Sequence, residues 1–563
     1  MQGRQILSAS GKSPKLKYRD FGYKISDVSG WNGSSLILQA SLFLRMVSIT
    51  FVLSLLHAFS VAANANDANA TISWAVASVT KSLTTNVDIC CKALQLALGS
   101  KVSYPSSSEY STFLNNFYSQ QESQLSPGCI VSPTSTTDVS ISVGILSILG
   151  KLTNWSPSCQ FAIKSGGHAP GVSQANINQG VTINLSPLNF IDVSTDQSVV
   201  SVGPGARWGE VYLKLDALQL AVPGGRVNSV GVGGLTVGGG ISYFSPRKGF
   251  TCDNVKNFEI VLASGKIVNA NANQNSDLYL ALKGGSNNLG VVTRIDLYAF
   301  QQGKLWGGNI LYPATTAEQQ INALADFSSD PTYDEYASLI TSLAFQPNIG
   351  SVVVNSIVYT KPVANPAVYQ PFTAIQPQYS NTLRITNLTD IGSEEGGTSS
   401  HLRTLFITTT FKANKQMINA TYNAWNAALP SIQSLSNITW SLSFEPAPAN
   451  IPAKSASTGG NVLAVTPADG PLIVALLTAT WGNIADDTVV DNTAKAMFET
   501  IDAYAKASGL YNDWQYLNYA ANWQDPIDGL GAVNKAKLQA ASRKYDPLGV
   551  FQKGVTGGFK LFV

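Results

Sequence analysis

A histidine directly follows two glycines in the run Lys164-Ser165-Gly166-Gly167-His168. The chain holds only three histidines, and one of the others lies in an apolar stretch near the N-terminus. Residues 160–163, just before the motif, have the composition of a β-strand. Glycine leaves the backbone bare, so a ligand can lie against the main chain while the imidazole points at it. We therefore expect His168 to contact a bound cofactor.

Two further glycine clusters lie downstream, at residues 230–240 and 283–293. Valine and leucine are interspersed in the first cluster, which argues against a flexible linker and for positive φ angles or close approach of a ligand. Strand-like sequence borders all three clusters, so they can converge on one extended ligand. Bare backbone N–H groups suit phosphate oxygens. The sequence thus predicts a cofactor that carries phosphates.

Several other classes of protein lack support. The strict dinucleotide fingerprint fails because Thr236 stands where the third glycine belongs, and neither a P-loop lysine pattern nor a Gly-x-Ser-x-Gly elbow occurs. A Ser/His/Asp hydrolase has to use His168 or His401, and nothing near either histidine indicates one. With 12% charged residues, net charge +2 and no basic run among aromatics, we expect no nucleic-acid partner. Because no Cys-x-x-Cys pair occurs, we expect no metal site.

The elements that must hold these motifs follow from hydrophobic periodicity. Between residues 126 and 298 short β-branched runs alternate with glycine-rich turns, and we predict strands at 181–185, 199–202 and 294–298 and a helix at 208–215. After residue 301 we predict strands at 402–411, 438–444 and 472–481, and a helix through Met497, Phe498, Ile501 and Tyr504. The length of 563 residues implies two or three domains. This order predicts an α+β fold.

The N-terminal region favours export. Residues 46–63 are apolar and end in small residues, as a secretory signal does. We interpret Met46 as the true start and residues 1–45 as non-native, or alternatively as a cytoplasmic extension before a membrane anchor, since they carry seven Lys/Arg against two Asp. Glycosylation sequons begin at Asn69, Asn154, Asn184, Asn387, Asn419 and Asn437. We expect a secreted glycoprotein with no membrane contact once the signal is removed.

The five cysteines fit an oxidising compartment. Cys90, Cys91, Cys129 and Cys159 can form two disulfides with three possible connectivities, which leaves Cys252 free.

A resemblance becomes specific when the motifs are placed in order. The His168 motif is followed by Val222-Pro223-Gly224-Gly225-Arg226-Val227-Asn228-Ser229-Val230-Gly231-Val232-Gly233-Gly234, by residues 238–243, 252–255 and 283–293, and finally by Tyr516-Leu517-Asn518-Tyr519 and Lys544-Tyr545-Asp546-Pro547. This order resembles the berberine-bridge-enzyme-like branch of the vanillyl-alcohol-oxidase flavoproteins, which have a PCMH-type FAD-binding domain. The match covers about residues 85–300 and 510–563.

The resemblance implies a cofactor and its contacts. In that family the motif histidine is bonded covalently to the 8α-methyl carbon of FAD, so His168 inherits this role, for which a neutral imidazole is a suitable nucleophile. The other implied cofactor-binding residues are Ser165, Gly166, Gly167, Val230, Gly231, Gly234, Gly239, Gly240, Val292, Asn518 and Tyr519. Val230 lies where relatives gate the access of dioxygen, and ordinary packing is its alternative role.

Tyr516 resembles the family tyrosine that lies on the substrate side and helps to take a proton, so it is the catalytic candidate; core packing is the alternative. A phenol with a pKa of about 10 needs its anion stabilised by neighbours to act as a base near neutrality.

One position departs from the family pattern. Many relatives hold the flavin by a second bond, from a cysteine three residues before the Val-Gly-x-Gly-Gly element, and here that residue is Val227. Valine has no thiol, so we expect attachment through His168 alone and a lower flavin potential than in doubly linked relatives.

The resemblance also implies the architecture and the activity. We expect a two-part FAD-binding domain at 66–303, after a signal peptide at 46–65, an α+β substrate domain on an antiparallel sheet at 304–500, and a segment at 501–563 that returns to the FAD-binding domain. The expected activity is oxidation of a small alcohol, phenolic or secondary-metabolite substrate with dioxygen as acceptor. A dehydrogenase with another acceptor and a non-catalytic flavin-binding surface glycoprotein are the alternatives. His401 is expected to be a solvated loop residue, and the sequence indicates no oligomeric state.

Overall fold

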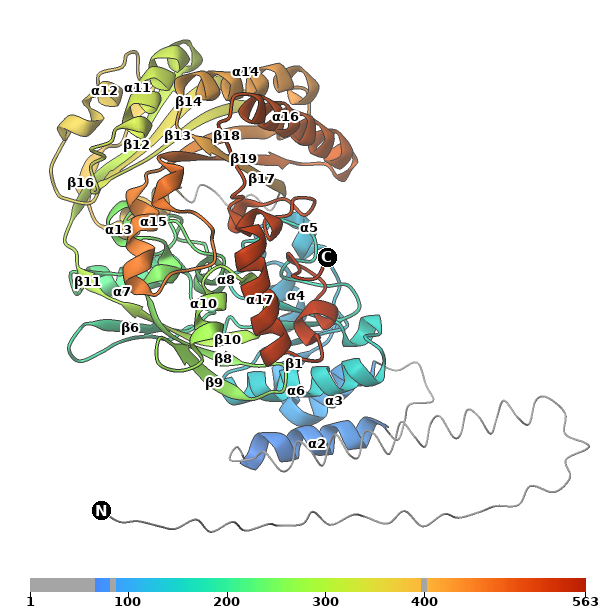
Figure 1. Cartoon of the computed structure of the whole chain (residues 1–563). Coiled ribbons are helices and arrows are strands. Elements are labelled where there is room, and N and C mark those ends of the chain that lie inside the picture. Colours follow the sequence, from blue (N-terminus) through green and yellow to red (C-terminus); the bar gives the residue numbers. More distant parts are fainter. Residues whose placement is uncertain (1–65, 81–87, 396–401) are drawn as a thin grey trace, which may run out of the picture. The chain divides into compact units, whose positions relative to one another are not determined.

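The computed structural model describes residues 66–80, 88–395 and 402–563 (Figure 1). The predicted extension, the signal peptide and His401 lie outside these residues. Within the described ranges no helix has the length and apolar character needed to cross a membrane.

A four-stranded sheet forms the base of the N-terminal region. Its order is β1 (Val102–Ser103), β2 (Cys129–Val131), β4 (Val181–Asn184) and β3 (Phe161–Lys164). Strand β4 runs parallel to both β2 and β3. Helices α2 (Asn66–Thr80), α3 (Ile89–Leu98) and α6 (Thr136–Leu152) share one apolar core with this sheet. The last residue of β3 is Lys164, so the His168 motif begins where this strand ends.

Two disulfides fix this region. They join Cys90 to Cys159 and Cys91 to Cys129, which selects one of the three connectivities that the sequence left open. Adjacent residues of α3 are thereby tied to β2 and to the turn before β3. The fifth cysteine, Cys252, is free and buried, as predicted.

A second sheet is entirely antiparallel. Its order is β5 (Ile191–Val193), β6 (Val199–Val202), β10 (Val291–Tyr298), β8 (Val255–Val261) and β9 (Ile267–Asn271). Helices α7 (Trp208–Asp216), α8 (Val232–Val237), α10 (Ser276–Leu282) and α17 (Gly531–Tyr545) contribute to the same core. The last α-helix, α17, packs on α10, so the C-terminal segment lies against the glycine-rich part of the chain.

The third layer is a nine-stranded antiparallel sheet. It contains β15 (Ser380–Asn381), β12 (Leu305–Pro313), β14 (Gly350–Tyr359), β13 (Ala337–Gln346), β18 (Thr439–Ala447), β19 (Leu472–Trp481), β17 (Arg403–Lys412) and β20 (Tyr511–Asn512) in that order, with β16 (Arg384–Thr386) also on β12. Helices α11 (Ala317–Ser329), α14 (Lys415–Ile432) and α16 (Asp487–Ala507) cover its outer face in Figure 1. The opposite face turns toward the glycine clusters.

Short elements complete the fold. These are α4 (Ser108–Leu114), α5 (Gln120–Ser123), β7 (Leu220–Ala221), α9 (Ser245–Lys248), β11 (Phe300–Gln301), α12 (Gln370–Thr373), α13 (Leu388–Glu395) and α15 (Asn450–Ser455).

The α+β prediction is confirmed, and each predicted strand or helix overlaps an observed one. In α16 the predicted face is buried at Met497, Phe498 and Ile501, whereas Tyr504 is exposed. The sequence did not predict α8, because the glycines of that segment disfavour a helix. Packing overrides propensity there, since Val232 and Thr236 of α8 are completely buried.

Candidate active site

A cavity of about 520 Å³ lies between the glycine clusters and the inner face of the nine-stranded sheet. The predicted site residues that line it are Ser165, Gly166, Gly167, His168, Val230, Gly231, Gly234, Val292, Tyr516, Asn518 and Tyr519. Val227, at the position of the missing cysteine, lines it as well. Residues more than 300 positions apart in the sequence therefore meet in one place.

Gly239 and Gly240 do not line the cavity. Both have positive φ, 113° and 84°, and their carbonyls accept hydrogen bonds from the backbone N–H groups of Cys252 and Thr251. A β-carbon on Gly240 would press against the Thr251 side chain. These two glycines shape the turn after α8 rather than a ligand surface.

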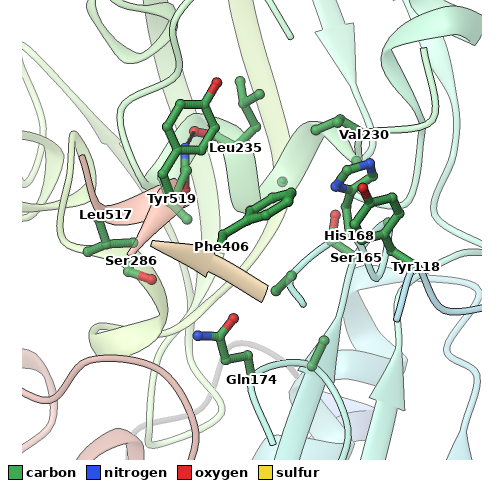
Figure 2. Close-up of a pocket in the computed structure, with 18 of the residues that line it drawn as sticks. Tyr118, Ser165, His168, Gln174, Val230, Leu235, Ser286, Phe406, Leu517 and Tyr519 are labelled. Atoms are coloured by element: carbon green, nitrogen blue, oxygen red, sulfur yellow. Dashed lines mark hydrogen bonds between the residues drawn. The ribbon is translucent and has the colours of Figure 1, made fainter. Parts of the chain in front are cut away.

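His168 stacks on Tyr118, with ring centroids 4.0 Å apart and planes at 15°. Figure 2 shows this pair beside Ser165 and Val230. Its Nε2 atom is buried and has no hydrogen-bond partner among the described residues. Burial, and then repulsion from the Arg207 guanidinium, lowers the pKa of His168 to about 4. The imidazole is therefore neutral at pH 7, with a nitrogen unused by the protein.

The motif loop and the second glycine cluster touch backbone to backbone. A β-carbon on Gly166 would collide with the main chain of Gly231, and one on Gly231 would collide with Gly166. Arg207 ties the same two segments together, because Nη1 donates to the carbonyl of Ser229 (2.8 Å) and Nη2 to that of Gly166 (3.2 Å). By contrast, a β-carbon on Gly234 would meet no atom within 4 Å. We call residues 165–168 and 230–235 the glycine wall.

Lys164, the first residue of the motif, does not line the cavity. Its side chain is fully buried beneath Gly167, and its Nζ lies 5.2 Å and 5.0 Å from the ring centroids of Phe113 and Phe117. Burial, followed by repulsion from Arg207, lowers the pKa of Lys164 to about 8. Lys164 thus supports the loop from below through cation–π contacts.

Tyr516 and Tyr519 lie with their rings 4.7 Å apart but differ in their hydrogen bonds. The Tyr516 oxygen accepts from the Ile241 N–H (3.1 Å) and from Asn518 Nδ2 (2.9 Å), and its own proton has no acceptor among the described residues. The Tyr519 hydroxyl accepts from Arg226 (2.6 Å) and donates to Glu445 (3.1 Å). Of these two tyrosines, Tyr516 is therefore the one that keeps a hydroxyl proton for exchange with a ligand.

The pKa of Tyr516 reflects opposing effects. Burial raises it to about 12, and the hydrogen bond from Asn518, that from Ile241 and the charge of Arg226 act in the other direction. The neighbours that the sequence required to stabilise the anion are present, but burial outweighs them. Tyr516 is a neutral phenol at pH 7.

The nine-stranded sheet supplies the opposite wall. Register places Ser342 of β13 opposite Ser443 of β18, and Ser441 of β18 opposite Thr478 of β19. The hydroxyls of Ser342 and Ser443 are 2.7 Å apart. We call the following residues the sheet wall: Ile340, Ser342, Phe406, Ser441, Ser443, Leu476 and Thr478. In Figure 2, Phe406 lies between Tyr519 and the Tyr118–His168 pair.

The sequence did not identify Tyr118, Arg207, Arg226, Glu395, Glu445 or the sheet wall. One signal was available in residues 439–445, where Trp440, Leu442 and Phe444 alternate with polar residues at the period of a half-buried strand. The apolar set is fully buried against the helices, so Ser441 and Ser443 face the cavity. No comparable pattern marked Tyr118 or Arg226. Across the described residues no cluster of three His, Cys, Asp or Glu side chains suits a metal ion.

The site has the features that an FAD requires. An unpartnered imidazole nitrogen is buried at the cavity surface, and open space lies where Gly234 lacks a side chain. Ser165 at the same wall is fixed by its hydroxyl, which donates to the carbonyl of Pro204 (2.5 Å).

Comparisons with known proteins agree with this geometry. Residues 127–271 match a family model described as FAD binding domain. The chain is 36% identical over 479 residues to the FAD-dependent monooxygenase drtC of Aspergillus calidoustus, which covers 84% of this chain and 90% of that protein. It is 35% identical over 480 residues to the FAD-dependent monooxygenase sdcF of Emericella nidulans, covering 84% and 98%.

Solved structures share the fold at lower identity. The 6-hydroxy-D-nicotine oxidase of Arthrobacter nicotinovorans superposes with a TM-score of 0.67 at 19% identity, covering 80% of this chain and 96% of that one. The glucooligosaccharide oxidase of Acremonium strictum gives 0.67 at 18%, covering 84% and 100%. The extent and identity of the curated matches establish that this chain belongs to the berberine-bridge-enzyme-like family of FAD-dependent oxidoreductases.

Proposed function

We propose that the protein is a secreted oxidase whose FAD is attached through His168 alone and whose substrate is a small alcohol, phenolic or secondary-metabolite intermediate. The observation that carries the proposal is the neutral, buried and unpartnered Nε2 side of His168 at the surface of the cavity that Tyr516 also lines. An imidazole without a protein partner on this nitrogen is free to engage the cofactor.

The glycine wall would hold the cofactor. When bound, FAD supplies a two-electron acceptor that takes a hydride from the substrate and is reoxidised by dioxygen to give hydrogen peroxide. Gly166, Gly231 and Gly234 line the cavity, and Gly234 leaves open space where it lacks a side chain. Tyr118 keeps the His168 ring in one orientation by stacking. Val230 and Val292 line the same cavity with apolar side chains, and Val230 is the candidate for controlling access of dioxygen.

Tyr516 would take the proton that the substrate hydroxyl loses as the hydride leaves. Its oxygen accepts two N–H hydrogen bonds, which stabilise a phenolate. The phenol itself has a pKa of about 12, so the reactive anion is a minor species at neutral pH and grows with rising pH. The Tyr519 hydroxyl already donates to Glu445, whereas the Tyr516 hydroxyl has no protein acceptor among the described residues, so Tyr516 is the better candidate for the catalytic base.

Attachment through one residue is supported by Val227. A valine at the cavity surface cannot form a thioether, whereas the glucooligosaccharide oxidase neighbour is described with a 6-S-cysteinyl, 8α-N1-histidyl FAD. The single bond should leave the flavin potential lower than in doubly linked proteins.

Secretion is supported by the two disulfides, because such bonds persist in oxidising compartments. The sequon residues Asn154, Asn387 and Asn437 are exposed, as glycan acceptors must be. A shift in mobility after deglycosylation of the protein recovered from the medium would test this part of the proposal.

The names of the relatives favour a second candidate, a monooxygenase. Such an enzyme inserts one atom of dioxygen into its product, whereas an oxidase releases both atoms as hydrogen peroxide. Turnover under ¹⁸O₂ separates the two. Labelled hydrogen peroxide formed in equal amount to unlabelled product supports the oxidase, and label in the product supports the monooxygenase.

The test of the cofactor assignment needs no substrate. The purified protein is denatured in acid, and flavin fluorescence is followed on the chain and in the supernatant. Fluorescence that stays with a peptide containing His168 supports the proposal. Flavin released entirely into the supernatant contradicts the covalent bond, and a colourless protein contradicts the flavin site itself.

A further inference from the structure

Arg226 forms a closed network with Glu445 and Tyr519 beside Tyr516. Its Nη2 atom is 2.6 Å from Glu445 Oε2 and 2.6 Å from the Tyr519 oxygen, while the Tyr519 hydroxyl donates to Glu445 Oε1. The ion pair is buried, because the side-chain exposure is 8% for Arg226 and 5% for Glu445. Burial opposes the charge of Arg226, but Glu445 and Tyr519 raise its pKa above the ordinary value. The guanidinium is therefore a permanent cation fixed in place.

This network leaves part of the guanidinium unused. Among the described residues Nε and Nη1 donate to no protein atom, and neither belongs to the fully buried polar atoms without partners. Because Arg226 lines the cavity, its residual exposure is exposure to the cavity. Those N–H groups are available to a ligand.

The geometry of the guanidinium restricts which ligand group can use them. Two edges of a guanidinium offer parallel N–H bonds, and Nη2 belongs to both edges. Both hydrogens of Nη2 are engaged here, one by Glu445 and one by Tyr519. Binding of a carboxylate or a phosphate by two parallel hydrogen bonds is thereby excluded. What remains suits a single oxygen atom.

The surroundings indicate what carries that oxygen. Tyr118, Phe406, Tyr516 and Tyr519 place four aromatic rings at the cavity, and successive pairs are 4.7 to 6.2 Å apart. Flat aromatic molecules pack well against such rings. Glu395 also lines the cavity. The charge of Arg226 is already balanced by Glu445, so the guanidinium offers no unpaired cation to a ligand with a full negative charge.

We propose that Arg226 determines substrate specificity by donating one hydrogen bond, from either Nε or Nη1, to a single ketone or phenolic oxygen on a planar aromatic substrate. The inference rests on the proposed function, since it names the substrate class of the same cavity. Glu445 and Tyr519 position the guanidinium and occupy its Nη2 atom, and the aromatic rings orient the flat body of the substrate.

The experiment compares three naphthalene probes on the flavin-loaded protein, by the change in the flavin absorption spectrum on titration. The probes are 1-naphthol, 1-naphthoate and 1-methylnaphthalene, which carry one oxygen, a carboxylate and no oxygen. We expect 1-naphthol to bind about tenfold more tightly than either of the others, the size of one hydrogen bond to a charged group.

The decisive variant is the double substitution Arg226→Met with Glu445→Met. Replacing a buried ion pair by apolar residues of similar length preserves folding better than removing one partner, which leaves a charge unpaired. The preference for 1-naphthol over 1-methylnaphthalene should disappear in this variant while covalent flavin remains on the chain. Arg294→Met, which removes an arginine that pairs with Glu259 and Asp296 and does not line the cavity, is the matched control and should keep the preference.

Retention of the 1-naphthol preference in the flavin-loaded double variant would overturn the inference, and so would tighter binding of 1-naphthoate than of 1-naphthol by the wild-type protein. Either result leaves the covalent flavin assignment untouched. Absence of flavin from the wild-type chain is the separate outcome that contradicts the proposed function. If the double variant does not fold, Arg226→Lys serves in its place, because lysine keeps the charge but presents a different donor geometry, and the same loss of preference is expected.

Discussion

The two walls of the cavity are built on different principles. The glycine wall consists of backbone: Gly166 and Gly231 touch main chain to main chain, and His168 projects from a loop after a strand. The sheet wall consists of side chains that reach the cavity only because β13, β18 and β19 pair in one register. A change in the glycine wall should therefore affect folding or cofactor, whereas a change in the sheet wall should affect the ligand alone.

The largest effect is expected from His168→Ala, which removes the only nucleophile proposed for attachment. Covalent flavin should fall to nothing, while the fold persists because the ring donates no hydrogen bond to the rest of the protein through Nε2. Mass spectrometry of the peptide that contains position 168 measures the covalent flavin, and a thermal melt measures whether the fold persists. Tyr118→Phe, which keeps the stacked ring, is the control and should retain attachment; covalent flavin in the alanine variant would refute the role of His168.

Tyr516→Phe should lower kcat/KM by about 100-fold or more, the size of a lost general base. Because the wild-type phenol has a pKa of about 12, its anionic fraction rises about tenfold per pH unit below that value, and log kcat/KM should climb with pH across the neutral and alkaline range. The phenylalanine variant should lose this slope. A slope that survives the substitution would show that another group takes the proton.

Two alanine substitutions separate the glycine that the fold requires from the glycine that the cofactor requires within the glycine wall. Gly231→Ala inserts a β-carbon into the Gly166 backbone and should destabilise the fold by about 2 kcal/mol or more. Gly234→Ala meets no protein atom, and alanine stabilises a helix by about 1 kcal/mol relative to glycine, so its melting temperature should hold or rise while flavin content falls. Unchanged flavin content in folded Gly234→Ala would mean that the cofactor does not lie there.

The smallest effect is expected at the sheet wall. Replacing Ser342 and Ser443 together by alanine removes both partners of one hydrogen bond, so stability should change by less than about 1 kcal/mol. KM for the substrate should rise about threefold, with kcat and covalent flavin preserved, because these hydroxyls lie on the sheet wall and not on the glycine wall that is proposed to hold the cofactor. Steady-state kinetics and the flavin absorbance of the same sample would check this prediction. A fall in flavin content would contradict the claim that the sheet wall does not hold the cofactor.

Much of the glycine wall could be predicted from the sequence, because its motifs are local. His168, Gly166 and Gly231 are recognisable from a few consecutive residues, and the structure brings them together at the cavity. Gly239 and Gly240 belong to the same cluster but lie against Cys252 and Thr251, a difference that composition does not reveal. A glycine required by a turn and a glycine required by a ligand look alike in a sequence.

The sequence by itself determined the α+β composition, the family and the two chemical candidates, His168 and Tyr516, because these depend on residue type and on short spacings. The tertiary structure decided which tyrosine keeps a free hydroxyl proton, which cysteines pair, and that Arg226 meets Glu445 across 219 positions. Such contacts depend on strand register and on the packing of distant segments. A shift of one residue in the pairing of β18 would turn Ser441, Ser443 and Glu445 away from the cavity. The alternation of Trp440, Leu442 and Phe444 indicates which face of β18 is buried, but only the tertiary structure shows which residues of β13 and β19 lie opposite it.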